Sequence, residues 1–333
     1  VSTAAQDLAG NAMLNAYTAT FTTVQSTPPA GMSNFCQTPP FAASTAVKPN
    51  VLLMVDNSGS MNEFAYKTKG YGDSNYDTSY DSGKTYYGYF DTTKMYQYDT
   101  TSGGFFKINS SATMDKTSFW SGNFLNWLTM RRVDLVRKVL VGGKIIPRSV
   151  ATANYALAHD NPDRDYYKRH VNNYYVIDNG KVYSCGNNSN CSTSNATNTY
   201  NIKIYVGENP PEEGLIIKMV DRINFGIMFF NEGPKFEDDQ SNKRDGGYVS
   251  VDIGSSGTNL LTQVEGTDPS TWTPLAETFY EATRYFQATT SQYNGGTYSG
   301  KDPISYACQK NFVLVLTDGE STKDQNLPGG NWG

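Results

Sequence analysis

The sequence predicts an α/β fold, an open and mostly parallel sheet with flanking helices and two long surface insertions. Three observations support this class: short apolar runs typical of buried strands, amphipathic stretches with helical spacing, and the alternation of the two along the chain. The 333 residues suffice for one large domain or two ordinary ones.

Four segments are predicted to be strands. Residues 51–55 (Val-Leu-Leu-Met-Val), 223–230 and 312–316 (Phe-Val-Leu-Val-Leu) are short apolar runs, as expected of strands buried on both faces. Residues 248–253 alternate polar and apolar side chains after two glycines, a pattern typical of a half-exposed edge strand.

Two segments are predicted to be helices. Residues 123–140 place Phe124, Leu135 and Val139 along one face and are followed by two glycines. Residues 274–287 begin with a proline suited to a first helical turn and carry apolar side chains at helical spacing.

Two long stretches, 62–122 and 148–222, interrupt this frame. Connections of this length are uncommon in compact domains and usually carry function or disorder. The first holds nine of the 24 tyrosines, and disordered segments are poor in aromatic residues. We therefore expect both to be folded surface excursions of one domain over residues 51–333, preceded by a lead-in segment over residues 1–50.

Composition narrows the class of protein. Only 18% of residues are charged, below the roughly 25% of an average globular protein, and Ser, Thr, Asn, Gly and Tyr fill the difference. This balance favours an exposed, loop-rich protein over a compact cytosolic enzyme. No apolar stretch approaches the roughly 20 residues that span a bilayer, so the chain is not expected to cross a membrane. A net charge of −5 without a block of Lys and Arg argues against nucleic-acid binding.

The cysteines point to an oxidising compartment. There are four of them, Cys36, Cys185, Cys191 and Cys308, and the chain begins at Val1, consistent with a removed signal peptide or a trimmed chain. Cys185 and Cys191 flank a short polar stretch that suits a disulfide, although four cysteines allow three connectivities. Four free thiols in a reducing cytosol are the alternative, which the composition disfavours.

The most informative segment directly follows the first predicted strand. Asp56, Ser58 and Ser60 form D-x-S-x-S at the carboxyl end of that strand, where open α/β sheets place their ligand sites. Thr273 adds a hydroxyl from a loop before the last helix, and Asp318 adds a carboxylate after the last strand. We predict that these five side chains share one hard cation, Mg²⁺ or Mn²⁺, with Ca²⁺ as a further candidate.

Such a site is suited to binding rather than catalysis. Five oxygen ligands with two negative charges leave the ion underneutralised and one coordination position open, which favours a carboxylate from a partner. Taken singly, each residue is better explained without a metal: the two serines as turn residues, Thr273 as a helix cap and Asp318 as part of a turn. The metal site is predicted from all the pieces together, in this order and after strands of the right type. Ser58 has no evident histidine partner, which argues against a serine hydrolase. We expect no enzymatic activity.

Two resemblances follow from these residues. The order D-x-S-x-S, then Thr, then Asp resembles the metal-ion-dependent adhesion site of von Willebrand factor A domains, which implies that the five residues are the ligands. Residues 119–127 (Phe-Trp-Ser-Gly-Asn-Phe-Leu-Asn-Trp), 132–134 (Arg-Val-Asp) and 308–312 (Cys-Gln-Lys-Asn-Phe) resemble the amino-terminal region of PilY/PilC-type adhesins of type IV pilus tips. This second resemblance covers most of residues 36–325.

The resemblance implies a secreted bacterial protein at the cell surface or pilus tip. Its expected roles are pilus biogenesis, surface attachment and twitching motility, with minor pilins and the acidic group of a ligand as partners. Two other functions stay open: a cell-envelope A-domain protein without a pilus role, and the A-domain subunit of an ATP-driven machine of the metal-chelatase type.

Two further expectations come from the resemblance. Family members normally continue into a β-propeller and A domains normally have more strands, whereas 15 residues follow Asp318, so we expect truncation after the fourth core strand. In the A-domain order the strands at 51–55 and 312–316 are neighbours. This implies a Cys36–Cys308 disulfide at the end opposite the metal, beside a local Cys185–Cys191 bond.

Overall fold

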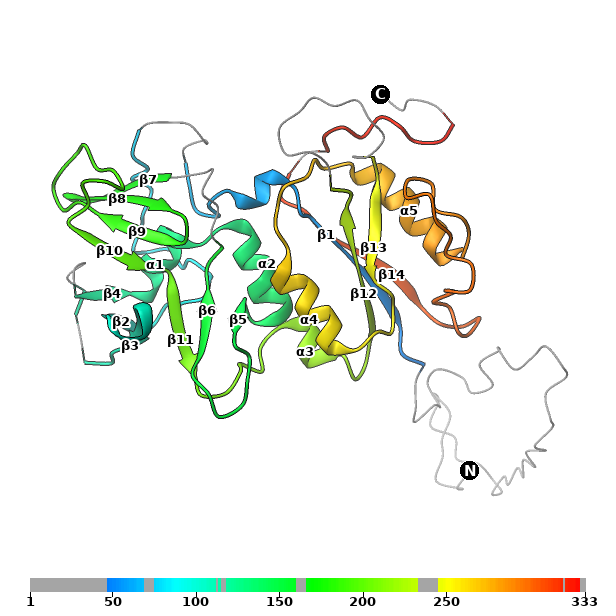
Figure 1. Ribbon diagram of the computed structural model, residues 1–333, viewed down its shortest axis with the longest axis horizontal. Helices are drawn as coiled ribbons and strands as arrows, with labels where there is room; N and C mark the ends of the chain where they lie inside the picture. The colour runs from blue at the N-terminus through cyan, green and yellow to red at the C-terminus, as the bar shows by residue number, and fades with distance from the viewer. Residues whose placement is uncertain are drawn as a thin grey trace, which may run out of the picture.

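A four-stranded, mostly parallel sheet is built from the four predicted strands (Figure 1). The computed structural model describes residues 47–68, 75–111, 113–114, 118–159, 166–232, 245–319 and 321–329. The strand order is β13-β12-β1-β14; β1 is parallel to both neighbours, and β13 runs antiparallel to β12. The strands are β1 (Asn50–Val55), β12 (Asn224–Phe230), β13 (Gly247–Val251) and β14 (Asn311–Leu316).

Helices cover the two faces of this core sheet (Figure 1). Leu53 packs with side chains of α2, α3 and α4 on one face, and its neighbours Leu52 and Met54 pack with α5 on the other. Successive strand residues point to opposite faces, which is why the unbroken apolar run of β1 suits a strand covered on both sides. The helices are α1 (Gly122–Thr129), α2 (Arg132–Val141), α3 (Leu215–Met219), α4 (Gly257–Gly266) and α5 (Leu275–Phe286).

Two sequence predictions about these elements are wrong in part. The helix expected over 123–140 is split, because Met130 and Arg131 are extended and Arg131 directs its buried guanidinium to the carbonyl of Asn62. Val139 is 47% exposed, since α2 turns a face containing Asp134 towards the interior. The strand β14 is covered on one face only: Phe312 and Leu314, which share a face, are 51% and 40% exposed, whereas Val313 and Val315 pack with side chains of α5. Within the described residues β14 is an edge strand with β1 as its neighbour.

The two insertions fold together rather than as separate surface excursions. Strand β3 from the first pairs with β11 from the second, through Phe106 and Ile204, within one six-stranded sheet of order β4-β2-β3-β11-β6-β5. A four-stranded antiparallel sheet of order β10-β9-β8-β7 packs beside it (Figure 1, left). The strands of these two sheets are β2 (Met95–Asp99), β3 (Phe105–Ile108), β4 (Phe119–Ser121), β5 (Ile145–Ile146), β6 (Asn154–Leu157), β7 (Tyr166–His170), β8 (Asn173–Asp178), β9 (Lys181–Ser184), β10 (Asn198–Asn201) and β11 (Lys203–Gly207); β5 lies just before the second insertion. The 3-10 turns are η1 (Gly59–Asn62) and η2 (Thr101–Gly103).

Aromatic side chains form most of the core beneath these insertion sheets. Trp120 and Trp127 are fully buried, and the rings of Phe124 and Tyr175 pack around them. Large aromatic side chains bury much apolar area each, so a segment with few aliphatic residues still closes a core. The tyrosine-rich composition of the insertions therefore serves packing to a large extent.

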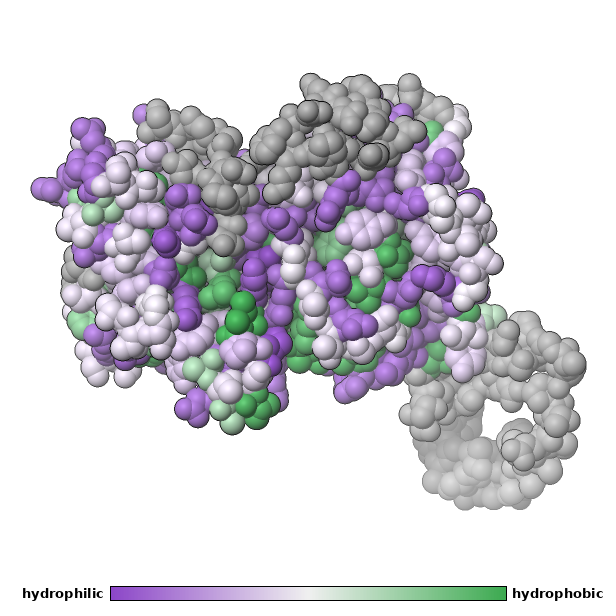
Figure 2. Space-filling model, viewed as in Figure 1, coloured by the Kyte–Doolittle hydropathy of each residue, from purple (hydrophilic) through white to green (hydrophobic). Residues whose placement is uncertain are grey.

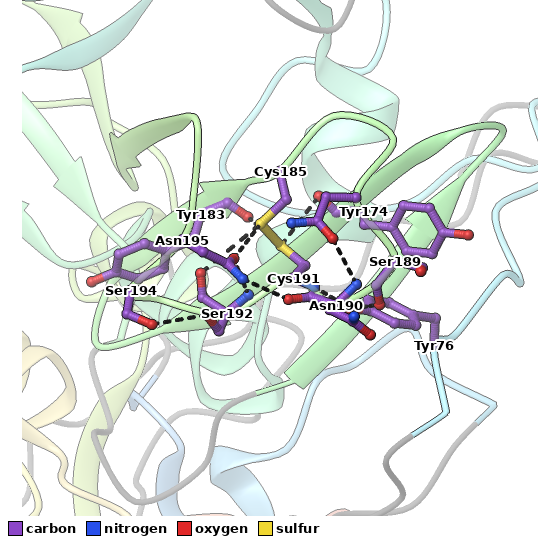
Figure 3. Close-up of a disulfide and its surroundings, with 11 residues drawn as sticks. Tyr76, Tyr174, Tyr183, Cys185, Ser189, Asn190, Cys191, Ser192, Ser194 and Asn195 are labelled. Atoms are coloured by element: carbon purple, nitrogen blue, oxygen red, sulfur yellow. Dashed lines mark hydrogen bonds between the residues drawn. A yellow bond between two sulfur atoms is a disulfide. The ribbon is translucent and has the colours of Figure 1, made fainter.

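The local disulfide Cys185–Cys191 closes a turn at the end of β9, with a Cα–Cα distance of 5.5 Å (Figure 3). The amide of Asn195 is directed back towards this turn and donates to the carbonyl of Asn190 at 2.8 Å. Cys308 is disulfide-bonded as well. Cys36, its expected partner, lies outside the described residues.

A buried ion pair on α2 joins the insertions to the core sheet. Asp134 is 0% exposed and lies 3.6 Å from the guanidinium of Arg137. Its Oδ1 accepts hydrogen bonds from the His159 amide at 2.9 Å and from the Tyr89 hydroxyl at 3.3 Å, both in the insertions. Arg137 in turn donates to the carbonyl of Thr267, after α4, at 2.5 Å. Burial raises the pKa of Asp134, although Arg137 opposes the shift.

His159 lies in the same junction and stays neutral. Burial, together with the positive charges of Arg137, Arg131 and Lys144, lowers the pKa of His159 to about 3. Its Nδ1 faces the Arg137 guanidinium at 3.5 Å, and its Nε2 has no hydrogen-bond partner in the described part of the chain. Sequence reasoning gave His159 no role, and the structure places it in the packing of this junction.

The visible surface is mainly polar, with apolar side chains gathered in the middle of the view (Figure 2). Among the described residues, no helix has both the length and the apolar character needed to cross a bilayer.

We predict that Asp134→Ala lowers the free energy of unfolding by about 3–5 kcal/mol, because it leaves the Arg137 charge buried without its partner. Urea denaturation followed by fluorescence measures this change. Val139→Ala, at an exposed position of the same helix, is the matched control and should cost under about 1 kcal/mol. Equal losses in the two variants would show that the ion pair does not hold the junction.

We also predict that stability falls as the pH is lowered from about 6.5 towards 3. In this range the unfolded chain protonates His159 and the folded protein does not, so folding loses up to about 1.4 kcal/mol per pH unit. Urea midpoints at pH 7.5 and 5.0 should therefore differ more in the wild type than in His159→Gln. The same pH dependence in both proteins would contradict a neutral, buried His159.

Candidate metal centre

The candidate site lies at the carboxyl ends of β1 and β14. The two strands pair in parallel up to Val55 and Leu316, and the amide of Asp56 donates to the carbonyl of Leu316 at 2.9 Å. The residues that follow each strand therefore emerge at the same edge of the sheet. This register brings Asp56 next to the loop of Asp318, although the two are far apart in the sequence.

Both oxygens of the Asp56 carboxylate are held in place. Oδ1 accepts from the amide of Ser58 at 2.7 Å, and Oδ2 accepts from the hydroxyl of Thr317 at 2.7 Å. Asp56 is only 1% exposed. The sequence analysis did not single out Thr317, which lies between the last strand and Asp318. In the structure its hydroxyl fixes the orientation of the Asp56 carboxylate.

The two serine hydroxyls connect the two loops. Ser58 Oγ and Ser60 Oγ lie 2.9 Å apart, and Ser60 Oγ donates to Asp318 Oδ1 at 2.8 Å. Ser60 reaches this position because η1 turns the chain immediately after Ser58. The structure thus brings together four of the five predicted ligands.

Thr273 lies in the adjacent loop but is not joined to the other four. Ser58 pairs with Thr271, and the amide of Gly59 donates to the Thr271 carbonyl at 2.9 Å. The backbone of Thr273 is held from the other side by Thr322, whose hydroxyl accepts from the Thr273 amide at 2.9 Å. In the described part of the chain, no hydrogen bond links the Thr273 hydroxyl to the four other side chains.

Asn57, the residue between Asp56 and Ser58, fixes the loop to the neighbouring strand. Its Oδ1 accepts from the amide of Phe230 at 2.9 Å, and its Nδ2 donates to the carbonyl of the same residue at 3.2 Å. The end of β1 is therefore tied to the end of β12 as well as to β14. The sequence analysis gave Asn57 no role, and only its tertiary contact with Phe230 reveals one.

Arg132 is a charged neighbour that the sequence did not assign to the site. It is the first residue of α2, and its Nη1 lies 2.5 Å from Asp318 Oδ2. The backbone amide of Arg132 donates to the carbonyl of Glu63 at 3.0 Å, which anchors the start of the helix beside the serine loop. One positive charge thus faces the second carboxylate of the site.

The oxygens that meet here, from carboxylates and hydroxyls, are of the kind that a small divalent cation takes as ligands. The Ser58–Ser60 and Ser60–Asp318 oxygen separations, 2.9 Å and 2.8 Å, are those of ordinary hydrogen bonds. The chemistry of the donors, rather than their spacing, is therefore what suits a cation. No group of three or more His, Cys, Asp or Glu side chains able to hold a metal occurs among the described residues, so a cation bound here would need hydroxyl ligands as well.

Comparisons with known proteins point to one family for the middle of the chain. Residues 77–212 match the family described as PilY1 homolog, small alpha/beta domain. These residues include α1, α2 and most of both insertions. No solved structure matches the chain.

Two curated relatives from Xylella fastidiosa (strain Temecula1) are both described as type IV pilus biogenesis factor PilY1 homolog. One is 40% identical over 74 residues, which are 22% of this chain and 5% of the relative. The other is 32% identical over an alignment of 127 positions, which covers 31% of this chain and 10% of the relative. The chain thus spans a small fraction of these relatives, and the similarity supports a PilY1-like factor related to type IV pili.

Proposed function

We propose that this chain is the A-domain region of a type IV pilus-associated adhesion and assembly factor. In this proposal it binds the acidic group of a partner through a divalent ion and supports pilus biogenesis, attachment and twitching motility. The observation that carries the proposal is the meeting of Asp56, Ser58, Ser60 and Asp318 at the carboxyl ends of β1 and β14. The similarity to PilY1 homologs supplies the link to pili.

The parallel order of β12, β1 and β14 supports assignment to the von Willebrand factor A class. In such open sheets ligands bind outside the carboxyl ends of the strands, where this site lies. Helices on both faces and the antiparallel edge strand β13 are compatible with the same assignment.

Each residue has a distinct task in the proposed binding step. Asp56 and Asp318 supply negative charge, and the hydroxyls of Ser58 and Ser60 supply neutral oxygen ligands. Thr273 lies in the adjacent loop, where its hydroxyl would add to this set. Bound Mg²⁺, Mn²⁺ or Ca²⁺ would supply a positive centre with an open position for a carboxylate oxygen. Pilus-tip proteins such as minor pilins are the proposed partners.

We propose binding without catalysis, outside the cell or at its surface. The Ser58 hydroxyl is engaged with Ser60, an arrangement suited to holding a cation rather than to nucleophilic attack. The Cys185–Cys191 bond favours an oxidising compartment and disfavours a cytosolic chelatase-type machine. A cell-envelope protein without a pilus role remains the competing function.

We predict that Asp56→Ala abolishes Mn²⁺ binding, because it removes the more buried of the two carboxylates. Isothermal titration calorimetry measures the binding, and circular dichroism should show an intact fold. In the source bacterium, replacing the gene by this variant should reduce surface pili and twitching. Unchanged Mn²⁺ affinity would refute the site, whereas lost affinity with normal pili and motility would favour the envelope function.

We also predict that Thr317→Val weakens Mn²⁺ binding by roughly tenfold, because the Asp56 carboxylate loses the hydroxyl that orients it and second-layer partners commonly contribute this much. Calorimetry with Mn²⁺ makes the comparison. The matched control is Thr262→Val on the exposed side of α4, whose affinity should equal that of the wild type. Equal affinities in all three proteins would show that Asp56 needs no such support.

A further inference from the structure

The carboxylate of Asp318 faces two different neighbours. Its Oδ1 accepts from Ser60, on the side of the serine loop, and its Oδ2 pairs with Arg132 at 2.5 Å. The same carboxylate is therefore shared between the proposed cation ligands and a fixed positive charge. We propose that Arg132 is the specificity-determining residue of the site, which makes binding of the divalent ion depend on a carboxylate ligand. This inference rests on the proposed function.

Charge is the first argument. Asp56 and Asp318 carry two negative charges, and Arg132 compensates one of them before any cation binds. A divalent ion then enters a site with one net negative charge, next to a positive guanidinium. The Coulomb repulsion between the two cations lowers the affinity for the bare ion. A site that was selected only to retain a metal gains nothing from this arginine.

The position of Arg132 is the second argument. Its side chain is 32% exposed, whereas that of Asp318 is 10% exposed, so part of the Arg132 side chain reaches solvent at the margin of the site. A guanidinium binds carboxylates through paired N–H groups, and Arg132 uses one nitrogen, Nη1, on Asp318. A ligand carboxylate is therefore able to contact the ion through one oxygen and Arg132 through the other.

The loops beside the site carry a further positive charge and an aromatic side chain. Trp272, between the two threonines of the adjacent loop, is 36% exposed, and Lys323 lies 5.6 Å from the centre of its ring. A second positive charge and an aromatic surface thus stand on the loops that border the serine hydroxyls. This margin suits an acidic side chain carried next to an apolar one.

Metal and ligand binding are coupled as a consequence. A carboxylate neutralises the excess positive charge created by the ion and Arg132 together. The ion therefore binds more tightly when the carboxylate is present, and the carboxylate binds more tightly when the ion is present. Linkage requires the carboxylate to raise the affinity for the ion by the same factor as the ion raises that for the carboxylate. Without Arg132, the ion binds well alone and the carboxylate adds little.

Calorimetric titration with MnCl₂ tests the proposed dependence of Mn²⁺ binding on a carboxylate. The titrations are made in about 100 mM sodium chloride and in about 100 mM sodium acetate, at the same ionic strength. The acetate data are corrected for the binding of Mn²⁺ by acetate itself. The variants are Arg132→Gln, Arg132→Lys and the control Lys138→Gln. Lys138→Gln makes the same charge change on α2, six residues or about 9 Å further along the helix. Thermal melts in EDTA verify that each variant is folded.

In chloride, Arg132→Gln should bind Mn²⁺ roughly tenfold more tightly than the wild type, and Lys138→Gln should stay within about twofold. Acetate should raise the wild-type affinity by roughly fivefold and leave Arg132→Gln nearly unchanged. Arg132→Lys keeps the charge, so its affinity in chloride should match the wild type, with a smaller effect of acetate.

Two results would overturn the inference, and they differ in what else they reject. Wild-type binding of Mn²⁺ with unchanged or weaker binding by Arg132→Gln rejects the role of Arg132 and leaves the metal site standing. Absence of Mn²⁺ binding in the wild type and in Arg132→Gln rejects the metal site and the inference together.

Discussion

The buried ion pair of Asp134 and Arg137 is the contact on which the rest of the structure depends. Asp134 receives hydrogen bonds from His159 and Tyr89, and Arg137 donates to Thr267. Removing one partner of a buried ion pair leaves an uncompensated charge, which is strongly destabilising. The pair therefore ties the insertions, α2 and the loop that leads to Thr273 to one another, although Arg137 Nε has no hydrogen-bond partner among the described residues.

Helix α2 consequently connects the buried ion pair with the candidate metal centre. Its interior side carries the ion pair, and its first residue, Arg132, stands beside Asp318. The first insertion leaves the core sheet after η1 and returns through α1 and α2, and the second follows α2 and returns through α3. The folding of the insertions therefore sets the position of Arg132. A substitution in the aromatic core of the insertions is thus able to shift Arg132 at the candidate metal centre. The shift passes through helix α2 rather than through the core sheet.

The sequence predicted the parts of the fold that depend on local pattern. The apolar run of β1 and the serine spacing after it lie within a few residues, so the position of Asp56 follows directly from them. Asp318 followed from the same reasoning on β14. The contact of Arg132 with Asp318 could not be predicted, because the two residues are 186 positions apart and the sequence around Arg132 has the pattern of an ordinary helix. The split at Met130 escaped prediction for a related reason: Arg131 is extended to satisfy a tertiary contact, which hydrophobic periodicity does not record.

The register between β1 and β14 also has a consequence for the order of events in folding. Ser60 and Asp318 are 258 residues apart, and Asp56 and Thr317 are 261 apart. Closing so long a loop is slow compared with forming local structure, so these contacts form late. A chain that is still emerging from the ribosome has the serine loop without its second carboxylate. Occupancy of this centre would then report that the whole domain has finished folding.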